Sequence, residues 1–171
     1  MSGAGLSITD QLSGALQALV RGLDQPDSLI TNIGVLLVQS TKDRFLAGQG
    51  PDGIPWAPLN PLYAATKKGP GILREAGAFG GLMSTIVWQR DGATALIVGT
   101  NRIYAAAHQF GAVIVPKTAA ALVFGLGEEL IHAQSVTIPA REFLGVSETD
   151  QEGMIHLATD YVASLAGQRP A

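Results

Sequence analysis

The sequence predicts an α+β fold with two N-terminal helices, a mainly antiparallel sheet built from hairpins, and a C-terminal helix. Leucines recur at helical spacing near the N-terminus, strand-like runs follow that are joined by glycine-containing turns, and a capped apolar stripe closes the chain. Helices grouped before hairpins are typical of α+β domains, and hairpin connections make the strands antiparallel. The 171 residues fit a single domain over residues 1–171.

The first two helices are predicted from their caps and apolar stripes. Residues 7–10 read as a helix start, with an oxygen cap and an acid three residues later. This helix should end at Gly22 and Asp24. Residues 24–27 open a second helix that runs to Phe45, with a proline in its first turn and acids near the positive end of the dipole. The stripe of the first helix consists of Leu12, Leu16, Leu19 and Leu23.

A proline- and glycine-rich loop follows the second helix. Residues 48–61 hold four prolines and three glycines, with Trp56 as the one large anchor. Residues 63–68 are predicted as a short helix, and Gly-Pro-Gly at residues 69–71 breaks the chain again. Residues 72–81 should form a helical turn or two that leads into a strand.

The first hairpin is the clearest strand signal. Residues 82–90 and 93–99 are strand-like runs joined at Asp91-Gly92, and Asp-Gly between such runs indicates a tight two-residue turn. Residues 104–109 are then predicted as a short helix or turn, closed by Gly111.

A second hairpin is predicted after the short strand at residues 112–115, which Pro116 stops. Its arms are residues 120–124 and 130–138, joined across residues 125–129. The first arm is wholly apolar. An exposed apolar strand edge is an aggregation hazard, so a partner is expected to cover it.

The last helix is predicted from its cap and its stripe. Residues 147–150 combine a serine with an acid three residues later, which is the pattern of a helix start. Its apolar stripe consists of Met154, Ala158, Tyr161 and Leu165.

Composition limits the possible functions. Apolar residues make up 47% and charged residues 15%, which is too apolar for disorder and less charged than usual. The net charge of −3 argues against a general nucleic-acid coat. Residues 42–117 carry eight basic and four acidic residues (+4), whereas residues 128–160 carry seven acidic and one basic (−6). Opposite charges suit head-to-tail contacts between copies; ordinary scatter of solvated charge is the alternative.

Targeting signals and cysteine chemistry are not expected. The sequence has no cysteine, which excludes disulfides, thiolate zinc sites and cysteine nucleophiles and fits a reducing cytoplasm. Residues 1–12 lack the basic start and long apolar run of a signal peptide. No run of 18 apolar residues occurs, so no membrane span or membrane partner is expected.

Catalytic and cofactor motifs are also missing. The three histidines lie far apart in the sequence, without the i, i+4 pair typical of metal sites, and no nucleophile elbow or phosphate loop occurs. Residues 77–81 read as a backbone bend, and Lys67-Lys68 as a solvated loop in place of a phosphate contact. Glu128-Glu129 reads as a solvated hairpin tip in place of a glycosidase pair. The sequence therefore predicts no catalytic, cofactor-binding or metal-binding residue and no enzyme.

Five short stretches between Phe45 and Ser147 form a pattern by their order and spacing. Three of them are Phe45 with Pro51-Asp52-Gly53 and Trp56, Gly80-Gly81-Leu82-Met83-Ser84, and Val98-Gly99-Thr100-Asn101. The two most specific are Tyr104-Ala105 with His108-Gln109-Phe110-Gly111, and residues 138–145, Ile-Pro-Ala-Arg-Glu-Phe-Leu-Gly. Together they resemble the phage virion morphogenesis family, which includes the tail-completion protein S of myophages and the G protein of Mu-like phages.

The resemblance implies a structural virion protein without catalytic activity. Its implied role is tail completion and head–tail joining as a homo-oligomeric ring, with a hexamer as the default. The implied place is the head–tail junction or the top of the tail, after assembly in the host cytoplasm. The implied partners are the chain itself, other neck, connector and tail proteins, and DNA that passes through the lumen. A tail terminator that caps the tail tube is the first alternative, and a DNA-binding or regulatory module the second.

The matching residues divide into expected fold anchors and an expected subunit interface. The interface centres on a projecting hairpin over residues 113–138, whose long apolar arm needs cover. The role of Arg141, which can form a bidentate pair with a carboxylate, stays open between fold and subunit contact. The expected anchors are Trp56, Tyr104, His108, Gln109 and Gly111; the expected interface residues are Ala121, Leu122, Val123, Phe124, Leu130, Arg141, Glu142 and Phe143.

Overall fold

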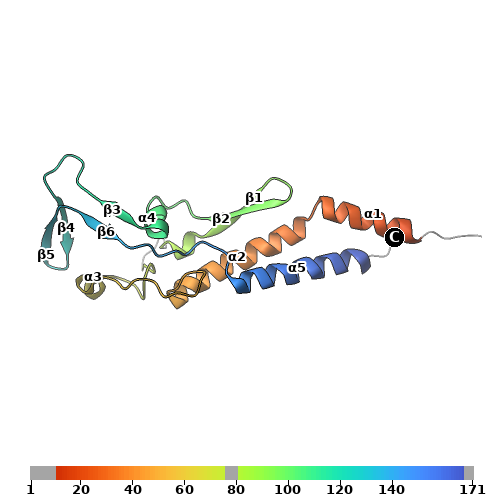
Figure 1. The fold of residues 1–171 in the computed structure, drawn as a ribbon, viewed down its shortest axis with the longest axis horizontal. Helices are drawn as coiled ribbons and strands as arrows, with labels where there is room; N and C mark the ends of the chain where they lie inside the picture. The colour runs from red at the N-terminus through yellow and green to blue at the C-terminus, as the bar shows by residue number, and fades with distance from the viewer. Residues whose placement is uncertain (1–10, 76–80, 168–171) are drawn as a thin grey trace, which may run out of the picture.

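Two long helices, α2 (Asp27–Ala47) and α5 (Glu148–Gly167), form the spine of the molecule, which we describe for residues 11–75 and 81–167 from a computed structural model. The helix α1 (Gln11–Asp24) lies with α5 at one end of an elongated subunit, and the strands β4 and β5 lie at the other (Figure 1). The fold is α+β, as the sequence predicts.

The helical end is built from α1, α2 and α5. The predicted start at residues 7–10 lies outside the described residues. Helix α1 ends at Asp24, as predicted, and Gly22 lies within its last turn. The missing side chain of Gly22 makes room for Leu165, since an added Cβ would lie 2.5 Å from the Leu165 Cδ1 atom. The Tyr161 hydroxyl donates to the carbonyl of Gly22 at 2.7 Å. At the end of α2, Gly48 adopts φ +70° and donates to the carbonyl of Arg44, a common helix terminus.

The segment between α2 and the first strand differs from the prediction. Helix α3 (Pro61–Thr66) begins earlier than expected, because the Asn60 side chain accepts from the amide of Leu62 at 2.9 Å and a proline fits the first helical turn. A turn at residues 72–73 stands where helical turns were predicted, and residues 76–80 lie outside the described residues. The short 3₁₀ helix η1 (Met83–Thr85) replaces the predicted start of the first strand.

The strands form three separate two-stranded antiparallel sheets. The second predicted arm, residues 130–138, is divided between two of these sheets, because its first part pairs with β4 and its last part pairs with β3. The pairs are β1 (Val87–Asp91) with β2 (Ala95–Gly99), β3 (Ala112–Ile114) with β6 (Val136–Ile138), and β4 (Leu122–Leu126) with β5 (Glu129–Ala133).

The two hairpin turns differ from the prediction in length and position. Asp91 pairs with Ala95, so the first hairpin turns over three residues, and Gly92 supplies the positive φ of +76°. In the second hairpin, Leu126 pairs with Glu129. The tight two-residue turn therefore lies at residues 127–128 and not in the first hairpin.

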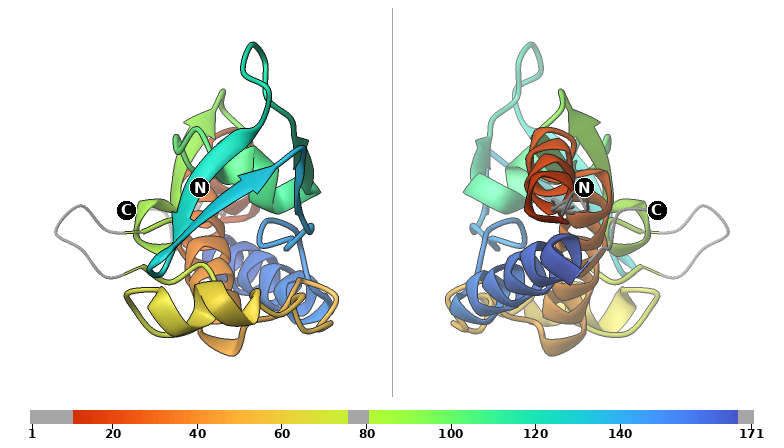
Figure 2. Two further views of the ribbon diagram at one scale, coloured as in Figure 1. Left: turned by 90° about the vertical axis from the view of Figure 1, so that its left-hand side faces the viewer. Right: turned by 90° about the vertical axis from the view of Figure 1, so that its right-hand side faces the viewer.

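The core lies where α2, the proline-rich loop and the segment before α5 meet. The Phe45 ring packs at 5.4 Å from Trp56 and at 5.3 Å from Phe143, measured between ring centroids. Figure 2 shows β4 and β5 lying above α3, with α2 and α5 running behind them. The buried cluster consists of Phe45, Trp56, Leu73, Leu82, Ile86 and Phe143.

Candidate assembly site at the hairpin end

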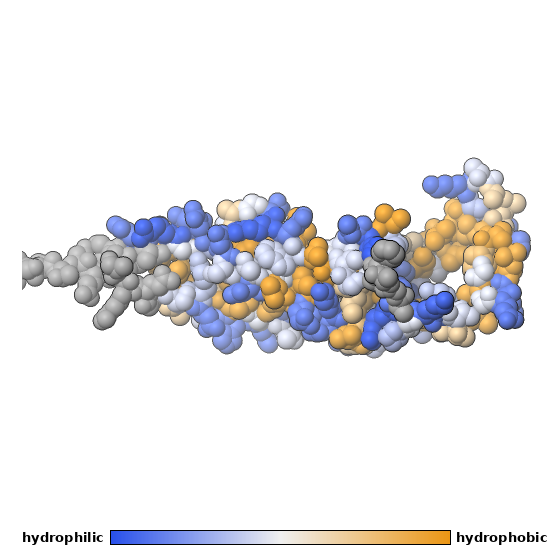
Figure 3. Space-filling model, turned by 180° about the vertical axis from the view of Figure 1, so that it is seen from behind, coloured by the Kyte–Doolittle hydropathy of each residue, from blue (hydrophilic) through white to orange (hydrophobic). Residues whose placement is uncertain are grey.

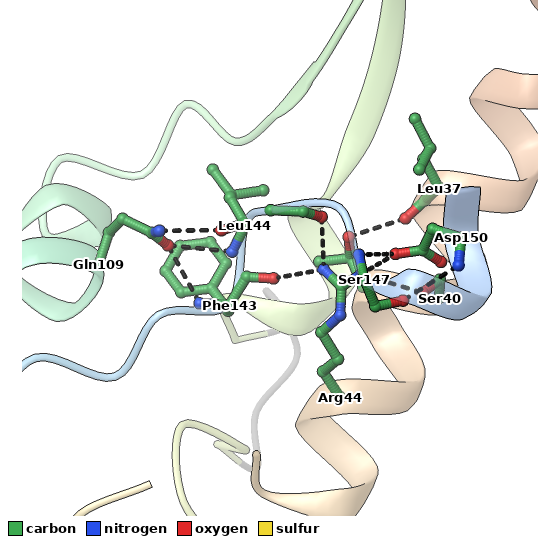
Figure 4. A network of polar contacts seen from close by, with 10 residues as sticks. Leu37, Ser40, Arg44, Gln109, Phe143, Leu144, Ser147 and Asp150 are labelled. Atoms are coloured by element: carbon green, nitrogen blue, oxygen red, sulfur yellow. Dashed lines mark hydrogen bonds and ion pairs between the residues drawn. The ribbon is translucent and has the colours of Figure 1, made fainter. Parts of the chain in front are cut away.

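The segment of residues 141–145 is fixed by side chains from remote parts of the chain. Gln109, on helix α4 (Ala105–Phe110), donates to the carbonyl of Leu144 at 3.0 Å and accepts from the amides of Phe143 and Leu144 at 3.1 and 3.0 Å (Figure 4). The Trp56 indole donates to the carbonyl of Glu142 at 2.9 Å. The Gln109 amide thus replaces a neighbouring strand, which gives this extended segment the partners that buried backbone needs.

Arg44 holds the other end of this segment. Its Nη1 donates to the carbonyls of Phe143 and Gly145 at 3.1 and 2.8 Å, and its Nη2 pairs with the carboxylate of Asp150. Asp150 also accepts from the amide of Ser147 at 2.8 Å, while its own amide donates to the Ser147 hydroxyl at 3.1 Å. This reciprocal cap is the helix start predicted at residues 147–150, but no local pattern indicates the ion pair between Asp150 and Arg44.

Tyr104, His108 and Gly111 lie together around α4. The Tyr104 and His108 rings are 6.0 Å apart in an edge-on arrangement. Gly111 has φ +74°, and an added Cβ would lie 3.0 Å from the amide nitrogen of Ala140. The His108 Nδ1 atom is buried without a hydrogen-bond partner. Burial, followed by the nearby Arg141 charge, lowers the pKa of His108 below its ordinary value, which favours the neutral imidazole.

Arg141 is buried, with 5% of its surface exposed. Its Nε donates to the carbonyl of Ala57 at 2.9 Å, and its Nη2 donates to the carbonyl of Pro58 at 3.0 Å. Both partners are neutral, and no carboxylate within residues 11–75 and 81–167 forms an ion pair with it. Arg141 thus ties the proline-rich loop to the segment before α5, but its charge is uncompensated there.

A cleft of about 680 Å³ opens beside Arg141, between α3 and the strands β4, β5 and β6. Its walls are mainly apolar, with Leu62, Phe124 and Ile131 among the lining residues. The polar side chains that reach it include Lys67, Glu75, His108 and Arg141. An apolar cleft with a few convergent polar groups is the usual form of a binding site.

The hairpin end also carries several large apolar side chains that are exposed in the single subunit. Val123 is 55% exposed and Leu130 65%, and Val113 on β3 is 65% exposed. Figure 3 shows these apolar surfaces gathered at one end of the molecule, which is hollowed there. Of the other expected interface residues, Phe124 and Glu142 are exposed, Ala121 and Leu122 are half-buried, and Phe143 is fully buried in the subunit core.

Among the described residues, no group of three or more His, Cys, Asp or Glu side chains is placed to hold a metal ion. None of the helices in the described part of the chain is long and apolar enough to cross a membrane.

Comparison with known protein families matches residues 8–163 to the phage virion morphogenesis family. No curated protein and no solved structure matches the chain. The matched range takes in the hairpin end, the cleft and the segment of residues 141–145.

Proposed function

Because the chain belongs to the phage virion morphogenesis family, we propose that it is a tail-completion and head–tail joining subunit that assembles into a homo-oligomeric ring. Members of this family are structural proteins, so the chain is a structural protein of phage virion morphogenesis and not an enzyme. Ring assembly and the position at the junction between head and tail go beyond what family membership shows.

The exposed apolar surface of the hairpin end is the main support for the proposal. The β4–β5 hairpin packs outside itself mainly on the short helix α3, and an isolated two-stranded hairpin is only marginally stable in water. It nonetheless exposes Val123 and Leu130 by more than half. Clustered apolar surface of this kind marks an interaction site, and a neighbouring subunit that covers it would also complete the sheet.

Charge separation favours copies of the chain as these neighbours. The +4 region over residues 42–117 supplies the cations of the loop that follows α3, whereas the −6 region over residues 128–160 begins at the hairpin tip. A contact between two different surfaces of identical subunits closes into a ring when the rotation permits. A hexamer is the proposed ring, with neck, connector and tail proteins above and below it and DNA passing through its lumen.

Deleting residues 118–130 tests the proposal at the level of the whole hairpin. The deletion protein should remain folded and monomeric, whereas the full chain should form rings, as measured by native mass spectrometry and negative-stain imaging. Rings formed by the deletion protein would refute the role of the hairpin. A full chain that stays monomeric at every concentration and is absent from mature particles would refute ring assembly itself.

A matched pair of point variants refines this test. Leu130→Glu places a charge in the hairpin surface, and Ile155→Glu makes the same change at a similarly exposed site on α5, since the two side chains are 65% and 67% exposed. Burying a leucine contributes about 1.5–3 kcal/mol, so Leu130→Glu should weaken association at least about tenfold. Ile155→Glu should leave it unchanged. In phage complementation, Leu130→Glu should yield separate full heads and tails, whereas a tail terminator would yield tails of abnormal length.

A further inference from the structure

Arg141 is a buried cation that lacks a counter-ion within the described chain. Buried charges in proteins are normally paired, because the interior does not replace the lost water. Arg44, equally buried at 5% exposure, has the carboxylate of Asp150. Arg141 has two neutral carbonyls on Nε and Nη2, and its Nη1 has no acceptor among residues 11–75 and 81–167. An anion is therefore the group that this site lacks.

The cleft makes Arg141 reachable from outside. Arg141 and His108 both line it, and the Nδ1 atom of His108 also lacks a partner. A carboxylate placed between them would accept one hydrogen bond from the Arg141 guanidinium and one from the His108 Nδ1–H tautomer. Lys67 adds a second cation to the lining, whereas Glu75 is its one acidic residue, which leaves a formal excess of positive charge. The apolar walls fit a hydrophobic side chain next to that carboxylate.

The hairpin tip carries this combination of groups. Glu128 and Glu129 are exposed like charges that form no ion pair with any described residue, and Leu130 beside them is 65% exposed. Gly127 rests on the side chain of Thr66 at the end of α3. The elements that carry the tip and line the cleft, α3, β4 and β5, lie at the same end of the subunit (Figure 1). Subunits standing side by side can therefore present tip and cleft to each other.

We propose that the cleft between α3 and strands β4, β5 and β6 receives the hairpin tip of a second copy of this chain, with a glutamate carboxylate against Arg141 and His108 and Leu130 against the apolar walls. This inference rests on the proposed ring and names its contact. Each subunit offers one tip and one cleft, so each copy can give its tip to one neighbour and receive the tip of another, which is the heterologous contact that a ring requires.

Removing the tip charge without changing its shape tests the contact in the full chain. Glu128→Gln/Glu129→Gln should weaken self-association at least tenfold in sedimentation velocity. Glu148→Gln/Glu152→Gln removes two exposed acids from α5 and should leave association within twofold of the natural chain. Equal association of the natural chain and the tip variant would overturn the inference while leaving ring assembly intact.

A peptide titration tests the cleft independently of ring formation. The Glu128→Gln/Glu129→Gln chain keeps an intact cleft, so the peptide Leu-Gly-Glu-Glu-Leu-Ile should bind it and shift the NMR signals of the His108 imidazole. The peptide with both glutamates replaced by glutamine should bind at least tenfold more weakly. Equal binding of the two peptides, or no saturable shift, would overturn the inference.

Substitutions in the cleft separate recognition from folding. Arg141→Gln should abolish peptide binding, and Arg141→Lys should restore part of it. Because Arg141 also ties the loop of residues 57–58, Lys67→Gln serves as a second variant that should weaken binding severalfold. Glu75→Gln removes the competing acid and should strengthen binding. Weaker binding by Glu75→Gln, or unchanged binding by both Arg141→Gln and Lys67→Gln, would show that the cleft does not recognise a carboxylate.

Discussion

Arg44 and Asp150 form a buried ion pair that joins the C-terminal half of α2 to the first turn of α5. Their side chains are only 6% and 4% exposed. The Arg44 guanidinium also binds the carbonyls of Phe143 and Gly145, so the same residue positions the segment that carries Arg141 into the cleft. The pair thereby links the helical spine to the proposed assembly site.

Asp150→Asn should destabilise the subunit strongly. The asparagine can still accept from the Ser147 amide, but it leaves the Arg44 charge buried without an anion. Removing one partner of a buried pair costs about 3–5 kcal/mol, measured as the free energy of unfolding in urea. Asp27→Asn is the control, because the Asp27–Arg90 pair lies at the surface with Asp27 70% exposed, and surface pairs contribute about 0–1 kcal/mol. Equal losses in the two variants would contradict this assignment.

The same pair should make stability depend on acid. Burial by itself raises the pKa of Asp150, but hydrogen bonds from Ser40 and Ser147 and the Arg44 charge outweigh it and hold the folded pKa below 3.8. The unfolded chain therefore takes up the proton first as pH falls. The contribution of Asp150 is present above pH 3.8 and is lost as pH falls through the folded pKa.

The difference in unfolding free energy between the natural chain and Asp150→Asn measures this contribution. It should be constant well above pH 3.8 and should shrink as pH falls below that value. His108, whose pKa is also lowered, contributes equally to both proteins and cancels. A difference that stays constant down to acid unfolding would refute the role given to the carboxylate charge.

Local signals in the sequence predict most of the elements. Helical periodicity locates α2, and the Ser147–Asp150 spacing locates the start of α5, because caps and stripes depend on residues within one or two turns. The two hairpins are also found, although their turns and the second arm of the later hairpin differ from the prediction.

Pairings between segments that are distant in the sequence cannot be predicted from these local signals. Residues 130–138 look like one strand, yet the chain divides them between β5 and β6, because partners in β4 and β3 decide the break. The cleft is invisible for the same reason: α3 and the strands that enclose it are more than fifty residues apart. Phe143 was expected at the interface, but its ring fills the space beside Phe45 in the core. We therefore leave it out of the contact proposed here.

Gly111→Ala should destabilise the link between α4 and β3. At φ +74° an alanine is strained, and its Cβ would lie 3.0 Å from the amide nitrogen of Ala140 and 3.1 Å from the carbonyl oxygen of Ile138. Such strain costs about 1–3 kcal/mol, measured by urea unfolding. Gly99→Ala is the control, since an added Cβ there meets no atom within 4 Å and its φ is not positive. A loss below about 0.5 kcal/mol for Gly111→Ala would show that the turn can relax.

Gln109→Ala should release residues 143–144 from α4. The substitution leaves two backbone amides and one carbonyl without the partners they have in the natural chain. Each unsatisfied buried group costs about 1–3 kcal/mol, so the unfolding free energy should fall by about 2 kcal/mol or more, and amide exchange at Phe143 and Leu144 should accelerate at least about tenfold. Gln39→Ala removes a single exposed bond to Asp43 and should cost under about 0.5 kcal/mol. Gln109 does not line the cleft. Gln109→Ala should therefore affect peptide binding in the cleft only by shifting Arg141. Unchanged exchange at both amides would mean that the core packing of Phe143 alone holds this segment in place.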